Sequence, residues 1–368
     1  MKQKITLAAL IPLVGALMCS CGAEVNSAGS PRTGTQVAAP VLTATSAQNG
    51  AVIVHLSAAD GTEIHFTVDG STPTAASQTY FAPFLVSSAL AVKAIAVASG
   101  NASPVTTQSF TTAIPAGTLV WSDEFTQSST AAGQPDPQVW TYDTGNSGFG
   151  NHELENYCAW GADNAPCSTS SSNAYVGADN LLHIVARQPS AGVYTSARLK
   201  TQGLFSFQYG RLEARLKLPE GAGMWPAFWL LGNSIAKAGW PASGELDVME
   251  HIDGSNPKNE GFDWVQGSIH GTGLDGGTQY HPVGFSAADW HTYGLIWSPG
   301  RIEYYVDDPS NVYATFTAAT QAGTWPFDSG PEFILLNLAV GGDWPGPPDG
   351  GTVFPTEMQV DYVRLYTN

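Results

Sequence analysis

The sequence predicts an all-β protein built from two β-sandwiches, and three observations lead to this prediction. No segment of the 368 residues shows a sustained helical period, whereas short stretches of alternating apolar and polar residues recur along the chain. Turn-forming residues separate these stretches, and the chain holds 40 Gly and 24 Pro. The chain also exceeds the roughly 250–300 residues at which one hydrophobic core stops growing, which indicates two domains.

The composition excludes several classes of protein. The chain has 14 Lys and Arg against 31 Asp and Glu, a formal net charge of −17, and only 12% charged residues beside 11% aromatic ones. Disordered chains combine few aromatic residues with many charges, so most of this chain is folded. A nucleic-acid-binding protein needs a basic face to neutralise phosphates, so we expect no nucleic-acid partner. A long helical bundle would need more Lys and Glu.

Residues 1–23 have the pattern of an export signal. Two lysines precede an uncharged, mostly apolar run, Ile5–Met18, which is too short to span a bilayer. This signal ends either by cleavage near Ala23 or by lipid attachment at Cys21, which is a loose match to the bacterial lipoprotein pattern. We therefore expect an exported protein, extracellular or on the surface of the cell envelope, whose only contact with the membrane would be a lipid anchor at Cys21.

The rest of the chain divides into a linker and two domains. Residues 24–37 are rich in Ser, Gly, Thr, Ala and Pro, which is typical of a flexible linker. Residues 38–115 hold short alternating stretches such as Glu63–Val68 and Leu90–Val97, which predict a small β-sandwich. Residues 117–368 form the second domain, whose size and strand pattern fit a two-sheet sandwich of the jelly-roll kind.

The first sandwich contains none of the 11 tryptophans. Its segments Phe66–Thr74 and Lys93–Ala98 resemble the immunoglobulin-like module at the C-terminus of chitobiases, and such modules accompany many secreted carbohydrate enzymes. Sugar-binding surfaces usually depend on exposed aromatic planes, so we interpret this module as a spacer. Tyr80, Phe81 and Phe84 could form a small sugar platform, but core packing or a turn is the preferred interpretation.

Cys158 and Cys167 are the only cysteines beyond the export signal. An exported protein meets oxidising surroundings, so we expect a disulfide that closes this loop. A zinc site would need more Cys or His residues nearby.

The segment Gly244–His251 contains three acidic residues at an informative spacing. On a regular strand Glu245 and Asp247 share one face, and Glu250 lies on the other. A one-residue β-bulge at Val248–Met249 would return Glu250 to the face of the other two acids. Like charges so close together raise one carboxyl's pKa, which lets one remain a proton donor while its neighbour is ionised. One alternative is a solvated edge strand, which the apolar residues between the acids disfavour. The other is a calcium loop, which would need alternating Asn, Gly and Asp residues that this segment lacks.

A tryptophan-rich strand lies just upstream, at Met224–Gly232. It places Trp225, Ala227 and Trp229 on one face, where two indoles could form a platform for sugar rings. The alternative is that both indoles belong to the core.

With these motifs in order, the second domain resembles glycoside hydrolase family 16, and within it the bacterial laminarinase-type endo-1,3-β-glucanases. The resemblance covers Val120–Tyr366, and the longer acidic spacing is the form seen in laminarinases, agarases and carrageenases. It rests on these segments, in this order: Trp121–Phe125, Gly150–Tyr157, Tyr209–Arg215, Met224–Gly232, Gly244–His251, Trp290–Gly294, Leu336–Gly342 and Val360–Arg364.

The resemblance implies a retaining hydrolysis of β-1,3-glucosidic bonds in laminarin-type polysaccharides, without a cofactor for catalysis. Glu245 would be the nucleophile and Glu250 the general acid/base, with Asp247 orienting the nucleophile. The positions expected to contact the sugar are Trp225, Trp229, Trp344, His270, Asn151, Glu155 and Asn337. For His270 a purely structural role is the alternative.

The resemblance further implies a structural calcium on the convex side of the sandwich. Its ligands would be Glu124, the Asp361 side chain and a backbone carbonyl near Asn180, and hard oxygen ligands of this kind suit calcium. The chain departs from the family pattern at three positions: Asp343, before Trp344, stands where Asn is common, Glu155 where Gln is common, and Asn180 where a turn Gly is common.

Three alternatives to the laminarin substrate remain open. The same fold could act on mixed-linkage β-1,3-1,4-glucan or on agarose or carrageenan, and an acidic chain suits sulfated carrageenan poorly. A non-catalytic glucan-binding protein would usually lack the two glutamates. We expect the protein to act as a monomer.

Overall fold

The computed structural model describes residues 36–126, 133–253 and 261–368. The expected export signal, Cys21 and most of the expected linker lie outside these ranges. Residues 37–368 form one compact unit, and it is nearly all β-structure, as predicted. Its one α-helix among the described residues is the short α1 (Ile235–Ala238). No helix in the described part of the chain is long and apolar enough to cross a membrane.

The first sandwich consists of two small sheets. Tyr80 and Phe84 pack with Phe66 in its core, where the Phe66 and Phe84 rings stack at 4.8 Å, so these aromatic residues form core rather than a sugar platform. Phe81, in contrast, is 38% exposed. One sheet has the order β1 (Val41–Ser46), β2 (Val52–Ser57), β5 (Phe84–Val86), and the other contains β4 (Gln78–Thr79), β3 (Glu63–Thr67), β6 (Leu90–Ala98), β7 (Asn101–Ala102) and β8 (Thr106–Phe110).

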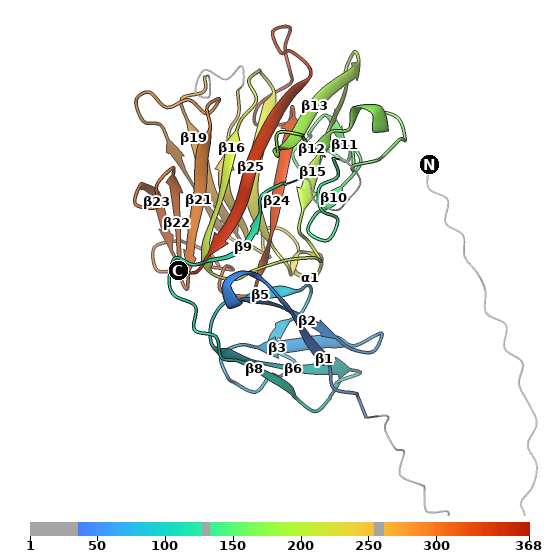
Figure 1. Ribbon diagram of the computed structural model, residues 1–368, viewed down its shortest axis with the longest axis vertical. Coiled ribbons are helices and arrows are strands. Elements are labelled where there is room, and N and C mark those ends of the chain that lie inside the picture. The colour runs from blue at the N-terminus through green and yellow to red at the C-terminus, as the bar shows by residue number, and fades with distance from the viewer. Residues whose placement is uncertain (1–35, 127–132, 254–260) are drawn as a thin grey trace, which may run out of the picture. The chain divides into compact units, whose positions relative to one another are not determined.

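The second sandwich packs a seven-stranded sheet against a ten-stranded sheet (Figure 1). Alternation along the strands separates its faces: Phe228 and Leu336 of the first sheet meet Leu212 and Val363 of the second in one continuous core. The seven-stranded sheet has the order β10 (Thr141–Asp143), β15 (Arg198–Lys200), β24 (Glu332–Val340), β17 (Met224–Gly232), β18 (Glu245–Glu250), β19 (Val265–Gly271) and β20 (Leu274–Tyr280).

The ten-stranded sheet is organised around β25 (Thr356–Tyr366). One edge of β25 pairs with β16 (Gly210–Lys217), and its other edge pairs first with β13 (Leu182–Ser190) and then with β9 (Leu119–Asp123). Segments far apart in the sequence therefore meet on one strand. The other strands are β11 (Glu155–Tyr157), β12 (Ala174–Val176), β14 (Val193–Ser196), β21 (His291–Ser298), β22 (Arg301–Val306) and β23 (Val312–Thr317).

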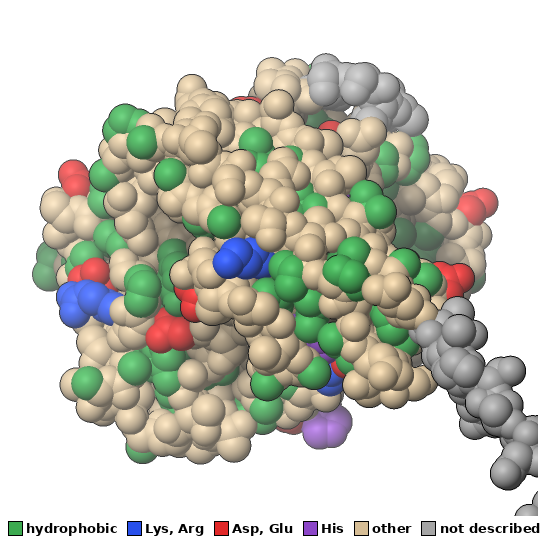
Figure 2. Space-filling model, turned by 90° about the horizontal axis from the view of Figure 1, so that it is seen from below, with side chains coloured by type: hydrophobic (Ala, Val, Ile, Leu, Met, Phe, Trp, Pro, Cys, Tyr) green, Lys and Arg blue, Asp and Glu red, His purple; other side chains and the backbone are tan. Residues whose placement is uncertain are grey.

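Charged side chains are sparse on the face of the molecule that Figure 2 presents, where isolated acidic and basic groups lie among uncharged ones. This distribution agrees with the 12% of charged residues in the sequence. The face offers no continuous basic surface of the kind that nucleic-acid binding needs.

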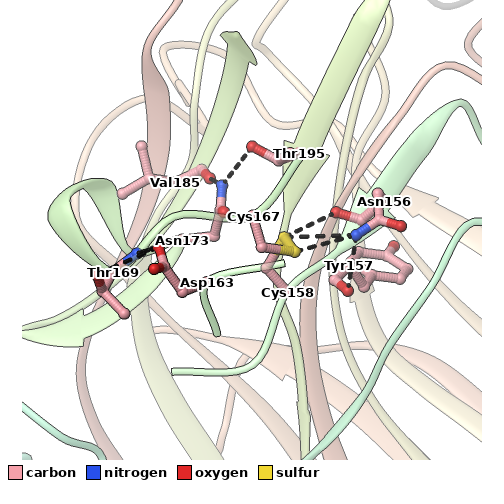
Figure 3. Close-up of a disulfide and its surroundings, with 9 residues drawn as sticks. All are labelled: Asn156, Tyr157, Cys158, Asp163, Cys167, Thr169, Asn173, Val185 and Thr195. Carbon is pink, nitrogen blue, oxygen red and sulfur yellow. Dashed lines mark hydrogen bonds between the residues drawn. A yellow bond between two sulfur atoms is a disulfide. The ribbon is translucent and has the colours of Figure 1, made fainter. Parts of the chain in front are cut away.

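A disulfide joins Cys158 and Cys167, the pair expected from the sequence (Figure 3). It closes the loop that follows β11, and the Asn156 side-chain amide donates a hydrogen bond to the Cys167 Sγ at 3.1 Å. Beyond the loop, the Asn173 amide donates to the Val185 carbonyl at 2.7 Å and to the Thr195 hydroxyl at 3.0 Å. The loop is thus held to the ten-stranded sheet at both ends.

Replacing both Cys158 and Cys167 by Ala should lower the free energy of unfolding by about 2–3 kcal/mol, because the open loop gains conformational entropy in the unfolded chain. Urea unfolding of the oxidised protein and the double variant measures the difference. A thiol reductant should destabilise the wild type and leave the double variant unchanged. Equal unfolding midpoints for the oxidised wild type and the variant would contradict a stabilising role.

Candidate active site

A cleft of about 770 Å³ lies on the face of the seven-stranded sheet that points away from the core. The residues that line it come from neighbouring strands: Trp225 from β17, the three acids from β18, His270 from β19 and Asn337 from β24. Because side chains alternate along a strand, Phe228 and Leu230 of the same β17 face the core instead.

A bulge in β18 brings the three acids to the cleft. The adjacent residues Phe228 and Trp229 of β17 pair with Met249 and Asp247 of the antiparallel β18. Val248 is therefore the extra residue in β18. The pairing with β19 shifts at the same place, between Asp247 and Glu250. Val248 and Met249 are buried in the core, and all three acids line the cleft. The bulge predicted at Val248–Met249 is confirmed.

Burial raises the pKa of all three acids in the cleft. Burial, followed by the charge of Asp247, raises the pKa of Glu250 to about 8, and a hydrogen bond from Trp225 opposes this rise. Burial and Asp247 also raise the pKa of Glu245 to about 8, and His270 and Arg198 oppose this rise. Such a cluster retains protons near neutral pH, so one carboxyl can donate a proton while another is ionised.

His270 connects Asp247 to a second acid. Its Nε2 lies 3.1 Å from the Asp247 Oδ2, and its Nδ1 lies 2.9 Å from the Asp275 Oδ1. The ring therefore contacts the acid cluster directly. Within the described ranges, one group of three His, Cys, Asp or Glu residues brings its potential metal-ligand atoms within 4.8 Å of one another. This group is Glu245, Asp247 and His270.

The two tryptophans of β17 differ in how accessible their rings are to a sugar in the cleft. The Trp225 indole N–H donates to the Glu250 Oε1 at 3.0 Å, and its ring meets Trp344 edge-on at 5.5 Å. Trp229 is only 8% exposed; its N–H donates to the Asn337 Oδ1 at 2.7 Å, and the Arg198 guanidinium lies 4.7 Å from its ring centre. Trp225 and Trp344 thus form the more open aromatic wall, and Trp229 supports the floor.

Two of the expected sugar contacts lie on the segment that ends in β11, and the structure separates them. Asn151 lines the cleft, where its amide donates to the Glu153 Oε1 at 3.0 Å. Glu155 does not line the cleft: it is fully buried, and its Oε2 accepts a hydrogen bond from the Val340 N–H at 2.6 Å. That expectation was wrong, because the Glu155 side chain is buried against the backbone of β24. Glu153, two residues earlier, lies in the cleft instead.

Several cleft residues were not predicted from the sequence. Arg198 enters the cleft from β15, next to Asn337 of β24. Trp240, on the loop before β18, is 62% exposed at the cleft and lies 6.2 Å from the His270 ring. The Trp240-Pro241 pair directly before the acidic strand was an available signal, whereas no local pattern distinguishes Arg198.

The expected calcium ligands converge on β25, although their carboxylates are engaged. One edge of β25 changes partner from β13 to β9 around Asp361, and Asn180 and Glu124 flank those two strands at this point. The Asp361 Oδ2 accepts a hydrogen bond from Arg215 at 2.7 Å, and Arg364 donates to both Glu124 oxygens at 2.8 and 2.9 Å. An ion at these positions would have to compete with two guanidinium groups for the carboxylates.

Paired carboxylic acids on the floor of an aromatic-walled cleft, on a two-sheet β-sandwich, define a glycoside hydrolase. The family model for glycosyl hydrolases family 16 matches residues 161–364, and the model named Fn3 associated matches residues 54–110. The chain belongs to glycosyl hydrolases family 16. This family assignment confirms the resemblance noted in the sequence.

The similar proteins include β-glucan hydrolases. The chain is 38% identical to a beta-glucanase from Rhodothermus marinus, over 67% of this chain and 84% of that protein. It is 35% identical to glucan endo-1,3-beta-glucosidase A1 from Niallia circulans, over 69% of this chain and 38% of that one. The solved laminarinase catalytic domain from Thermotoga maritima MSB8 aligns with a TM-score of 0.58 and 37% identity, over 69% of this chain and 99% of that domain.

The raised pKa of Glu250 predicts the alkaline limit of activity. A proton donor must be protonated, so a donor role for Glu250 predicts that kcat/KM falls as the pH rises through about 8, the pKa of this carboxyl. Because the hydrogen bond from Trp225 lowers that pKa, Trp225→Phe should move the alkaline limb to higher pH. The pH dependence of kcat/KM for both proteins measures this, and identical limbs would show that Glu250 does not set them.

Proposed function

We propose that the protein is a retaining endo-1,3-β-glucanase that hydrolyses laminarin-type β-glucans. The observation that carries this proposal is the bulge that aligns Glu245 and Glu250 on one wall of the cleft. A retaining mechanism needs two carboxyl groups about 5–5.5 Å apart, one as nucleophile and one as proton donor. Membership of the family and the β-glucanases among its relatives support the choice of substrate.

The reaction has two steps. The ionised Glu245 attacks the anomeric carbon, the bond from that carbon to the leaving oxygen breaks, and Glu250 gives this oxygen its proton. Glu250 then takes a proton from water, the resulting oxygen attacks the anomeric carbon, and the ester bond to Glu245 breaks. The product keeps the β configuration, Glu250 recovers its proton, and no cofactor takes part.

The neighbouring side chains keep the two glutamates in their roles. Arg198 favours the charged form of Glu245, which suits a nucleophile. Asp247, which is 4% exposed, raises the pKa of both glutamates, and His270 lowers it in both. The Trp225 N–H fixes the orientation of the Glu250 carboxyl. We propose Asp247, His270 and Trp225 as positioning residues on these grounds.

The charges along the cleft favour a neutral polysaccharide. Arg198 is the one Lys or Arg that lines it within the described ranges, whereas Glu153 and Asp275 line it besides the three acids of β18. A sulfated polysaccharide such as carrageenan would meet this negative field unfavourably. We propose that Trp225, Trp344, His270, Asn151 and Asn337 contact the glucan, with Trp229 supporting the floor beneath it.

Replacing each glutamate should identify its role through the stereochemistry of azide rescue. With an aryl β-glycoside of a laminari-oligosaccharide, azide should give Glu245→Ala the inverted α-glycosyl azide, because it replaces the nucleophile. In Glu250→Ala it should give the retained β-azide, because it attacks the glycosyl-enzyme. Without azide, Glu250→Ala should lose about 10²–10⁴-fold in kcat on laminarin.

Proton NMR identifies the azide anomers, and reducing-sugar release from laminarin, lichenan, agarose and carrageenan tests the substrate. Activity confined to agarose would overturn the proposed substrate and keep the roles of the residues. An inverted product from the wild-type enzyme would overturn the retaining mechanism.

We also propose a structural calcium bound by Glu124, Asp361 and a carbonyl near Asn180, which would tie β9 and β13 to β25. The meeting of these positions on one strand supports it. Calcium in excess over EDTA should raise Tm of the wild type by about 2–4 °C, the shift for about 1 kcal/mol in a domain of this size. Glu124→Gln should abolish the shift. Equal Tm in calcium and in EDTA for the wild type would contradict the site.

The cellular setting completes the proposal. We infer that residues 1–23 direct export, that Cys21 is the site of any lipid anchor, and that the enzyme works as a monomer outside the cell. We also infer two domains, residues 38–115 and residues 117–368. The sequence pattern at the N-terminus and the separate sheets of the two sandwiches support these inferences.

A further inference from the structure

The two sandwiches are joined by hydrogen bonds and apolar packing. The Leu85 N–H donates to the Ser206 carbonyl at 2.9 Å, and the Ser206 hydroxyl donates back to the Pro83 carbonyl at 2.7 Å. Ala51 of the first sandwich is 1% exposed and belongs to the core cluster of the second. On the same side, the Asn49 amide donates to the Leu119 carbonyl at 2.8 Å. A spacer that moved freely would make none of these contacts.

The contact extends to the loop Asn233–Ser243, which connects β17 to β18. Lys237, on the helix α1 of this loop, forms an ion pair at 3.0 Å with Glu63 of β3 in the first sandwich. A cavity of about 190 Å³ separates the two surfaces, lined by Thr79 and Phe81 on one side and by Ser234, Lys237 and Ala238 on the other. The first sandwich therefore covers the outer side of this loop.

The inner side of the same loop forms part of the active-site cleft. Ile235 and Trp240 both line the cleft. Ile235 packs against the apolar cluster of Ala227 and Trp229, whereas Trp240 is 62% exposed. The loop is closed at its base by the hydrogen bond from the Gly232 N–H to the Gly244 carbonyl at 3.1 Å. Between that base and Trp240, the Glu63–Lys237 ion pair holds the outer side of the loop.

We propose that the first sandwich is a positioning element of the active site: through the Glu63–Lys237 ion pair, which we call the brace, it holds the loop Asn233–Ser243 so that Trp240 stays in place at the cleft beside His270. This assigns the module a role beyond the spacer expected from its sequence. The catalytic acids are independent of the brace, because β18 is paired along both edges with β17 and β19. The proposal rests on the proposed function for the identity of the substrate.

A charge reversal in the full-length protein tests the brace. Glu63→Lys places two cations opposite each other, so hydrogen exchange of the amides of residues 233–243 should become faster. The swap Glu63→Lys with Lys237→Glu should restore the protection. Asp60→Lys is the matched control: it makes the same charge change at an exposed turn between β2 and β3, and it should leave the loop unchanged. Equal exchange in Glu63→Lys and the wild type would overturn the brace.

Steady-state kinetics on laminarin then test the link to the cleft. Glu63→Lys should raise KM about two- to fivefold, the range that an exposed ion pair contributes, with kcat unchanged. In a Trp240→Ala background the same change should have no further effect on KM, because the brace acts through Trp240. Phe81→Ala, at the cavity, should act in the same direction as Glu63→Lys.

Additive effects of Glu63→Lys and Trp240→Ala would overturn the proposed route through Trp240. A wild-type protein with no activity on any glucan would refute the proposed function alone, since the exchange measurement needs no substrate. Faster exchange in the loop with unchanged KM would overturn the role of the brace in substrate binding.

Discussion

One extra residue in β18 is the constraint on which the active site depends. Val248 is accommodated as a bulge because its side chain and that of Met249 are buried in the core, while pairing with β17 and β19 holds the strand on both edges. Without the bulge, Glu250 would point into an apolar core, where a carboxylate is very costly. The register of one strand thus decides whether the cleft contains both glutamates or Glu245 alone beside Asp247.

The groups around these acids determine how burial affects their protonation. Low solvation raises the pKa of all three carboxyls and so favours their protonated forms. The protonated form suits a proton donor but not a nucleophile. Asp247 raises and His270 lowers the pKa of both glutamates, and the difference between them comes from other neighbours: Arg198 of β15 favours the charged form of Glu245, whereas the hydrogen bond from Trp225 acts on Glu250. Trp225 connects this electrostatic arrangement to the wall of the cleft through its bond to Glu250.

The sequence predicted best what one strand or one long motif carries. The bulge at Val248–Met249 follows from three acids and two apolar residues in a row, and the two-sandwich fold follows from the alternation and the length. Glu155 was placed wrongly because β11 has only three residues and pairs in parallel with β14, a partner that local periodicity does not reveal. Arg198 reaches the cleft through the order of the strands, so no local pattern locates it beside the acids, whereas the position of Trp240 shortly before the acidic strand was a signal that the sequence offered.

The pairing of β25 has a consequence for how the protein folds. This strand, residues 356–366, is bordered by strands from residues 119–123, 182–190 and 210–217, so the ten-stranded sheet has a gap at its centre until these distant segments meet. Folding of the catalytic sandwich is therefore dominated by contacts distant in sequence, which makes it slow.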